Sequence, residues 1–219
     1  MGGDMTLHVS RRSLLEMGLA TGFGLAACAP AWAIAAEAGL SLELVGRARA
    51  ALAAHRDQLQ YADRIGIVDF ASPSRAARFH VLDLADGRAV SHLVAHGRGS
   101  DPAHTGWVTR LSNEPGSFAS SAGAYVTRDL YVGAHGRSMR LAGLDPANSN
   151  AESRALVIHA AWYVSPQAAR ATGMIGRSEG CFAVSSDSLG PVLAQLGPGR
   201  MIYAGQFGAG ARGRAIGGA

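Results

Sequence analysis

The chain has 219 residues, 48% of them hydrophobic, so it can bury one sizeable core but is short for two domains. All 20 basic residues are arginine, and the absence of lysine excludes Schiff-base enzymes, Ser–Lys dyads and the lysine of phosphate-binding P-loops. The formal net charge is only +4, and no arginine-rich block with interleaved aromatic residues occurs, which argues against nucleic acid as a partner.

The first 33 residues have the features of an export signal. Arg11 and Arg12 precede an apolar stretch that is too short for a transmembrane helix, and residues 31–33 (Ala-Trp-Ala) form a small-x-small cleavage pattern. We therefore expect a periplasmic or cell-envelope protein exported by a twin-arginine signal. A second interpretation stays open, because residues 25–28 resemble a lipobox, and lipidation at Cys28 would attach the mature protein to the membrane.

The rest of the chain predicts a mostly-β domain with short helices, preceded by one N-terminal helix over residues 37–60. Strands are expected at 65–70, 78–84, 89–95, 124–132, 138–142, 155–160 and 201–204, and helices at 166–172 and 186–196. Asp86-Gly87 predicts a hairpin turn between the second and third strands. The loop over residues 97–123 is long enough to be functional, and the Gly- and Ala-rich residues 207–219 are expected to form a disordered tail.

Cysteine is scarce in this sequence. Only Cys28 and Cys181 occur, so cleavage after Ala33 would leave a single thiol in an exported protein. Such proteins usually pair their cysteines or avoid them, which makes a reactive nucleophile the leading interpretation and an inert buried cysteine the alternative. His159 follows an apolar strand and is a candidate base for this thiol. Gly180 permits a close backbone approach beside the nucleophile, where N–H groups can stabilise an oxyanion.

The order of these residues resembles the L,D-transpeptidase (YkuD-like) catalytic domain, and more closely its divergent murein L,D-transpeptidase branch. The family pattern is a histidine followed by Ser-x-Gly-Cys, matched here by His159 and by residues 178–181. Supporting stretches occur at residues 96–100, 112–113, 116–117, 120–125, 143–144 and 148, so the resemblance covers residues 62–206. Two positions depart from the pattern: Glu179 stands where many members have histidine, and Ala183 where many have arginine or asparagine.

The resemblance implies an L,D-transpeptidase-like β-sandwich and a peptidoglycan L,D-transpeptidase activity. Cys181 would attack a stem tetrapeptide with His159 as base, Gly180 and Cys181 would supply oxyanion N–H groups, and Ser178 would orient the histidine or its own turn. The substrate-binding candidates are Ser117, Ser120, Ser121, Tyr125 and Arg177. Because the departures remove a basic partner for the substrate carboxylate, Arg177 or Arg140 is expected to replace it. No metal or organic cofactor is implied, and the partner is the stem peptide of the cell wall, bound by a monomer.

Other functions are weighed against this one. Residues 176–180 also spell Gly-x-Ser-x-Gly, but a serine hydrolase of that type needs a histidine after the serine, and His159 is the last in the chain. His92, His96 and His104 lack an accompanying set of acidic residues or cysteines, which disfavours a metal site. L,D-carboxypeptidase, endopeptidase and a non-catalytic wall-binding module remain as alternatives.

Overall fold

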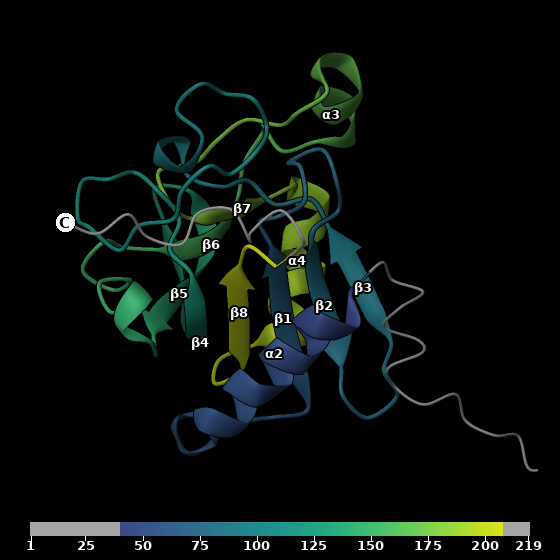
Figure 1. Ribbon diagram of the computed structural model, residues 1–219, viewed down its shortest axis with the longest axis vertical. Coiled ribbons are helices and arrows are strands. Elements are labelled where there is room, and N and C mark those ends of the chain that lie inside the picture. Colours follow the sequence, from purple (N-terminus) through teal and green to yellow (C-terminus); the bar gives the residue numbers. More distant parts are fainter. Residues whose placement is uncertain (1–39, 208–219) are drawn as a thin grey trace, which may run out of the picture.

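The structure, a computed structural model, describes residues 40–207 (Figure 1). The export signal predicted over residues 1–33 lies outside these residues, as does the predicted tail apart from Phe207. The helices and strands follow in the order α2 (Leu42–Ala54), η1 (Arg56–Gln58), β1 (Arg64–Asp69), β2 (Phe79–Asp83), β3 (Ala89–His92), η2 (Arg98–Ser100), β4 (Gly123–Gly133), β5 (Gly136–Gly143), η3 (Pro146–Asn148), β6 (Val157–Ala160), α3 (Pro166–Thr172), β7 (Phe182–Val184), α4 (Ser186–Leu196) and β8 (Met201–Gly205).

The strands form one eight-stranded sheet in the order β3-β2-β1-β8-β4-β5-β6-β7. Neighbouring strands are antiparallel except for the pairs β1–β8 and β6–β7, which are parallel. The prediction of a mostly-β domain with short helices is therefore confirmed, and the sandwich is a single continuous sheet. The hairpin predicted at Asp86-Gly87 is also confirmed, with β2 and β3 antiparallel and Gly87 at a φ of 75°.

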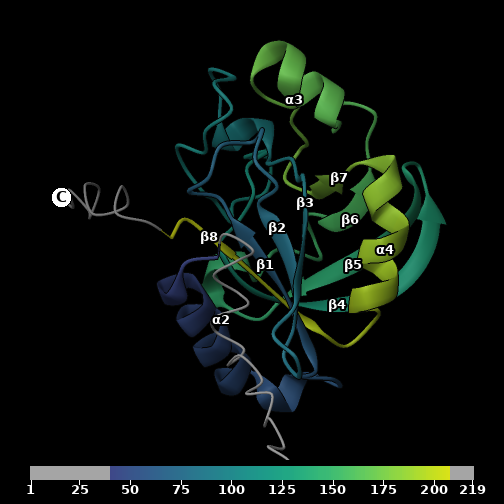
Figure 2. The ribbon, with the colours of Figure 1, turned by 90° about the vertical axis from the view of Figure 1, so that its right-hand side faces the viewer.

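Helices cover both faces of the sheet (Figure 2). Ile65 and Ile67 of β1 pack in the apolar cluster that contains Leu44 of α2. Val68 belongs to the larger cluster that contains Leu193 of α4. Because side chains alternate between the two faces of a strand, a strand covered on both sides is apolar at nearly every position.

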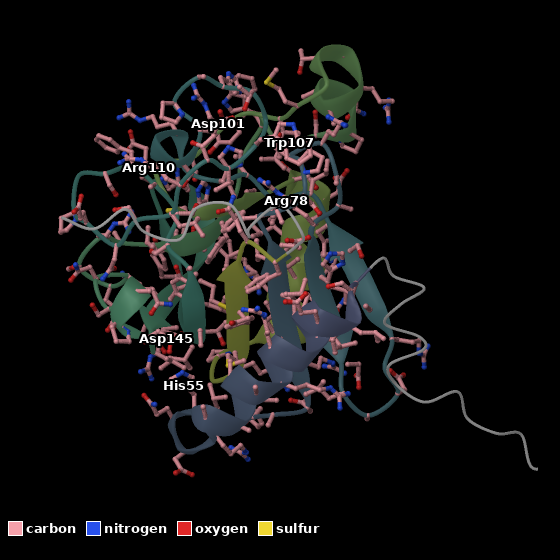
Figure 3. All side chains as sticks on the ribbon, in the orientation of Figure 1. His55, Arg78, Asp101, Trp107, Arg110 and Asp145 are labelled. Carbon is pink, nitrogen blue, oxygen red and sulfur yellow. The ribbon has the colours of Figure 1, made fainter. Side chains whose placement is uncertain are left out.

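Helix α2 begins at Ser41, whose Oγ accepts a hydrogen bond from the Leu44 N–H at 3.1 Å. It ends at His55, so it is shorter than the helix predicted over residues 37–60. The His55 Nε2 lies 2.9 Å from Asp145 Oδ1, and the two residues lie close together at one end of the molecule (Figure 3). This contact fixes the end of the helix against the turn that follows β5.

The two ends of the sheet meet. A register shift between Thr127 and Leu130 interrupts the β4–β5 ladder. Val94, just beyond β3, forms a bridge with Val184 of β7, and the Ala95 N–H donates to the Ala183 carbonyl at 2.8 Å. We call this contact between the two edges the sheet closure. The sheet closure brings the loop over residues 96–121 against the segment that precedes β7. Strand β7 itself was not predicted, because it has only three residues.

Among residues 40–207, no helix is long and apolar enough to cross a membrane.

Candidate active site

A cavity of about 580 Å³ opens at the sheet closure. Its wall combines the loop over residues 96–121, the β4–β5 turn, the segment around β6 and the turn before β7. The lining residues are Arg98, Pro115, Gly116, Phe118, His135, Ser153, Arg154, Ala155, His159, Tyr163, Arg177, Ser178, Glu179 and Cys181.

His159 reaches this cavity from β6, and Cys181 reaches it from the turn directly before the parallel strand β7. Ile158 pairs with Phe182, and both side chains are buried in the larger core cluster. His159 follows Ile158 within β6, and Cys181 directly precedes Phe182 and packs against the edge of the same core cluster. Both the imidazole and the thiol line the same cavity.

The hydrogen bonding of His159 fixes its tautomer. Its Nδ1 lies 2.9 Å from the Ala160 carbonyl oxygen, which can only accept, so Nδ1 carries the proton and Nε2 is left as a proton acceptor. The ring stacks on His135, with ring centroids 4.3 Å apart and an interplanar angle of 22°. Burial lowers the pKa of His159 below its ordinary value, the Ala160 bond raises it, and the neighbouring His135 lowers it further. At neutral pH the ring is accordingly an uncharged base.

The thiol of Cys181 is partly exposed to the cavity and unpaired with any other cysteine of residues 40–207. Its Sγ lies 3.7 Å from the Ala155 carbonyl oxygen. Burial raises the pKa of the thiol, the Val157 N–H and the charge of Arg154 lower it, and Glu179 raises it. Because burial disfavours the charged form of both groups, the resting pair consists of a neutral thiol and a neutral imidazole.

Ser178 and Gly180 shape the turn that carries the thiol. The Ser178 hydroxyl donates to the Cys181 carbonyl at 2.7 Å and accepts from the Gly180 N–H at 3.1 Å. The Ser178 hydroxyl thus stabilises its own turn and forms no hydrogen bond with His159. The Gly180 N–H, expected to be an oxyanion donor, is occupied by this serine. Gly180 has a φ of 120°, and a Cβ there would lie 2.9 Å from the Ala119 carbonyl oxygen.

The loop over residues 96–121 lies directly against this turn. The Ser178 N–H donates to the His96 carbonyl at 2.9 Å, and the Arg98 N–H donates to the Ser178 carbonyl at 2.7 Å. Gly97 makes the approach possible, since a Cβ there would lie 2.2 Å from the Phe118 carbonyl oxygen and 2.8 Å from the Gly180 nitrogen. The glycines of the 96–100 stretch therefore let two backbone segments come into contact beside the turn that carries Cys181.

Four of the predicted substrate-binding residues do not line the cavity, which corrects that prediction. Ser120, Ser121 and Tyr125 are fully buried behind the wall, and Ser117 lies beside the lining residue Phe118. Ser120 accepts from the Gly97 N–H and donates to the Gly180 carbonyl, so its hydroxyl joins the loop to the turn. Such residues position the site through hydrogen bonds and have no exposed atoms for a ligand.

Of the two arginines proposed for carboxylate binding, only one lines the cavity. Arg177 lines the cavity, and its Nη1 donates to the carbonyls of Asp101 and Pro102. Arg140 lies elsewhere, with its guanidinium 4.2 Å from the Tyr131 ring centroid. The structure adds Arg154, His135 and Tyr163 to the cavity wall. No motif in the sequence marks these three, because each approaches the site through tertiary contacts.

Three buried polar side chains, Arg78, His96 and Asp101, contact one another at the base of the loop over residues 96–121. Arg78 and Asp101 are labelled in Figure 3. Arg78 Nη2 lies 2.7 Å from His96 Nδ1, and His96 Nε2 lies 3.4 Å from Asp101 Oδ2, a long contact. Burial lowers the pKa of Arg78 to about 9 and that of His96 to about 4, the latter with help from the charge of Arg78. His96 is therefore neutral and accepts a hydrogen bond from a charged arginine inside the protein.

Residues 40–207 contain no group of three or more His, Cys, Asp or Glu side chains that could hold a metal ion. His92, His96 and His104 thus form no metal cluster within this part of the chain.

The sequence matches the model of a family described as the L,D-transpeptidase catalytic domain over residues 36–204. No curated protein matches the sequence at a significant level.

Solved structures with a similar fold include an L,D-transpeptidase from Mycobacterium smegmatis, which has 14% identity and a TM-score of 0.40 over 66% of this chain and 59% of that chain. An L,D-transpeptidase from Xylanimonas cellulosilytica has 16% identity and a TM-score of 0.39 over 80% and 78%. The helical cell shape determining protein Pgp2 from Campylobacter jejuni has 12% identity and a TM-score of 0.42 over 77% and 58%. The chain thus spans less than two thirds of the first of these structures, and the sequence match alone carries the assignment below.

Proposed function

Because this chain belongs to the L,D-transpeptidase catalytic domain family, we propose that it is a cysteine acyltransferase that acts on peptidoglycan stem peptides. Cys181 is the proposed nucleophile and His159 the proposed base. The single observation that carries the proposal is that both side chains line one cavity, His159 from β6 and Cys181 from the turn before β7. A solvent-reachable thiol beside an imidazole is the minimal equipment for acyl transfer through a thioester.

The tautomer of His159 determines the first step. With Nδ1–H directed at the Ala160 carbonyl, Nε2 takes the proton from the Cys181 thiol. Because the resting pair is neutral, the histidine acts as a general base that takes the thiol proton before the sulfur attacks. The sulfur then bonds to the carbonyl carbon between the L-centre of diaminopimelate and the terminal D-alanine of a tetrapeptide stem.

Collapse of the tetrahedral intermediate completes the transfer. The carbon–nitrogen bond breaks, His159 returns its proton to the D-alanine nitrogen, and the tripeptide acyl group remains on Cys181 as a thioester. An amine of a second stem attacks next, which regenerates the thiol and forms a cross-link. Ser178 contributes by fixing the turn, and the Cys181 N–H is the proposed oxyanion donor, because the Gly180 N–H already donates to Ser178.

The charge of the cavity suits this substrate. The cavity wall contains three arginines and one acidic residue: Arg98, Arg154, Arg177 and Glu179. Stem peptides carry several carboxylates, so an excess of positive charge favours their approach and orientation. Arg177 is the proposed contact for a substrate carboxylate, because it is on the wall while Arg140 is not.

The same site supports two alternative reactions that differ only in the acceptor. Water in place of the amine would make the protein an L,D-carboxypeptidase, and attack on an existing cross-link would make it an endopeptidase. A non-catalytic wall-binding module is the alternative of a different class. We propose the transpeptidase, working as a monomer without a cofactor in the periplasm or cell envelope, with export by the twin-arginine signal. Attachment to the membrane would require lipidation at Cys28.

One experiment distinguishes these functions. The mature chain, residues 34–219, is incubated with purified tetrapeptide monomers and dimers, and the products are identified by mass spectrometry. New cross-links identify a transpeptidase, tripeptide alone a carboxypeptidase, and loss of cross-links an endopeptidase. Cys181→Ala should abolish turnover and covalent labelling by a carbapenem. Wall binding without any turnover by the unmodified protein would contradict the proposal and identify a binding module.

A further inference from the structure

Arg154 has a positive charge that no acidic side chain balances. Its Nη1 donates to the Ser112 carbonyl at 2.8 Å and to the Ser121 hydroxyl at 3.1 Å, and its Nη2 donates to the Ala119 carbonyl. All three acceptors are uncharged. Within residues 40–207, no carboxylate forms an ion pair with this half-buried guanidinium. Charged groups removed from water are normally paired, so the arrangement lacks a counter-charge.

The guanidinium lies directly beside the nucleophile turn. A Cβ on Gly180 would be only 3.1 Å from Arg154 Nη2, and Gly180 immediately precedes Cys181. The next residue after the arginine, Ala155, has its carbonyl oxygen 3.7 Å from Sγ. Arg154 and Cys181 also line the same cavity. The charge and the sulfur are therefore neighbours across the turn.

We propose that Arg154 supplies the counter-charge of the Cys181 thiolate, the negative ion that exists once His159 has taken the proton. Arg154 is a positioning residue, because it stabilises the charge on the sulfur and anchors the loop beside the turn without contacting the substrate. The inference deepens the proposed function, on which its catalytic meaning depends. In the ionisation step the Sγ–H bond breaks, the electron pair stays on sulfur, and the proton goes to His159 Nε2. After this step the cavity holds a thiolate, an imidazolium and the guanidinium of Arg154.

The other charged and titratable groups around the sulfur do not replace Arg154. Glu179 opposes ionisation, and its charge is paired with Arg98 at 3.1 Å. Arg177 directs Nη1 at the carbonyls of residues 101 and 102. Tyr163 has a pKa raised to about 12 by burial and by the charges of Cys181 and Glu179, so it stays neutral, and His135 stacks on His159. The charge of Arg154 lowers the pKa of the thiol, opposing the larger effect of burial.

Thiol ionisation tests this inference without any substrate. The ultraviolet absorbance of the thiolate and the rate of alkylation by iodoacetamide are followed against pH in the mature protein, in Arg154→Gln and in Arg154→Lys. We expect the glutamine variant to require a higher pH for ionisation and to react about tenfold more slowly at neutral pH, since one charge is lost. Arg154→Lys should stay close to the unmodified protein. Arg140→Gln, the same change outside the cavity, should leave the thiol unchanged.

The lysine variant separates charge from anchoring. Lysine donates from a single nitrogen and glutamine from a single amide group, so neither reproduces the planar fork of the guanidinium. A purely structural role would therefore move both variants equally, and that result would overturn the inference. An unchanged thiol titration in Arg154→Gln, with a raised KM for stem peptides, would also overturn it and assign Arg154 to the substrate. If Arg154→Gln does not fold, Arg154→Met keeps the apolar stem and replaces it as the neutral variant. A shifted titration in a protein that turns over no stem peptide would refute the proposed function and leave the inference intact.

Discussion

The two walls of the cavity hold their residues by different means. On the strand wall, His159 lies in β6 and Cys181 directly before β7, and their neighbours Ile158 and Phe182 are paired and buried in the core. On the loop wall, Arg98, Gly116 and Phe118 belong to a loop whose position depends on single hydrogen bonds and close backbone contacts. A register fixes side-chain direction for every residue of a strand, whereas a loop is fixed one contact at a time. The following predictions disturb one wall while the other stays in place.

The largest effect is expected for Gly97→Ala, which forces the loop wall away from the nucleophile turn. The new Cβ would meet two backbone atoms within 2.8 Å, and backbone cannot yield as a flexible side chain does. We expect the free energy of unfolding to fall by about 1–3 kcal/mol. We also expect most of the covalent labelling by a carbapenem to be lost. Urea titration and mass spectrometry measure the two effects.

Gly46→Ala on α2 is the matched control for this variant. Nothing lies within 4 Å of a Cβ at that position, so the same change should raise the stability by about 0.5–1 kcal/mol. Equal stabilities for Gly97→Ala and the unmodified protein would mean that the two backbone segments are not held in contact.

The second effect concerns the polar support of the loop wall and its response to acid. His96 has a folded-state pKa of about 4 against an ordinary value of 6.5, so between these pH values the unfolded chain binds the extra proton. Its contribution to stability is therefore complete above pH 6.5 and is lost as the pH falls to 4, by roughly 3 kcal/mol. His96→Gln should show a flatter dependence of the unfolding free energy on pH in this window. Identical slopes would show that the ring of the folded protein is already protonated.

The third effect lies on the strand wall. His135→Phe keeps a ring stacked on His159 but removes the nearby titratable group that lowers the pKa of His159. The pKa of His159 should rise, so the uncharged base would appear only at higher pH. The acidic limb of the pH–rate profile should then move upward, with less than about a tenfold loss at the optimum because the base itself remains. An unmoved limb would assign it to another group.

The smallest effect is expected at the exposed rim. Glu179 raises the pKa of Cys181, but its side chain is 68% exposed and its charge is paired with Arg98. Glu179→Gln should therefore accelerate thiol alkylation by less than about threefold. Glu43→Gln on α2, which also removes one partner of an exposed ion pair, serves as the control. A slower reaction in Glu179→Gln would reverse the assigned sign.

The sequence predicted the strand wall better than the loop wall. The apolar run before His159 and the Ser-x-Gly-Cys motif indicated two side chains that line the cavity, because strand periodicity and a short motif are local properties. Ser120, Ser121 and Tyr125 lie in the same stretch as the lining residue Phe118, and composition could not show that they turn inward. Arg154 was missed for a related reason, since its three acceptors lie at least 33 residues away in the chain.

The sheet closure has a consequence beyond placing the nucleophile. An open sheet exposes two edges that can recruit strands from other molecules. In this chain Val184 of the terminal strand is already bridged to Val94, and the reactive turn sits beside that bridge. Separating the two edges would displace the turn that carries Cys181 and expose unpaired strand edges, which are prone to aggregation. Resistance to self-association and retention of reactivity therefore depend on the same few backbone bonds.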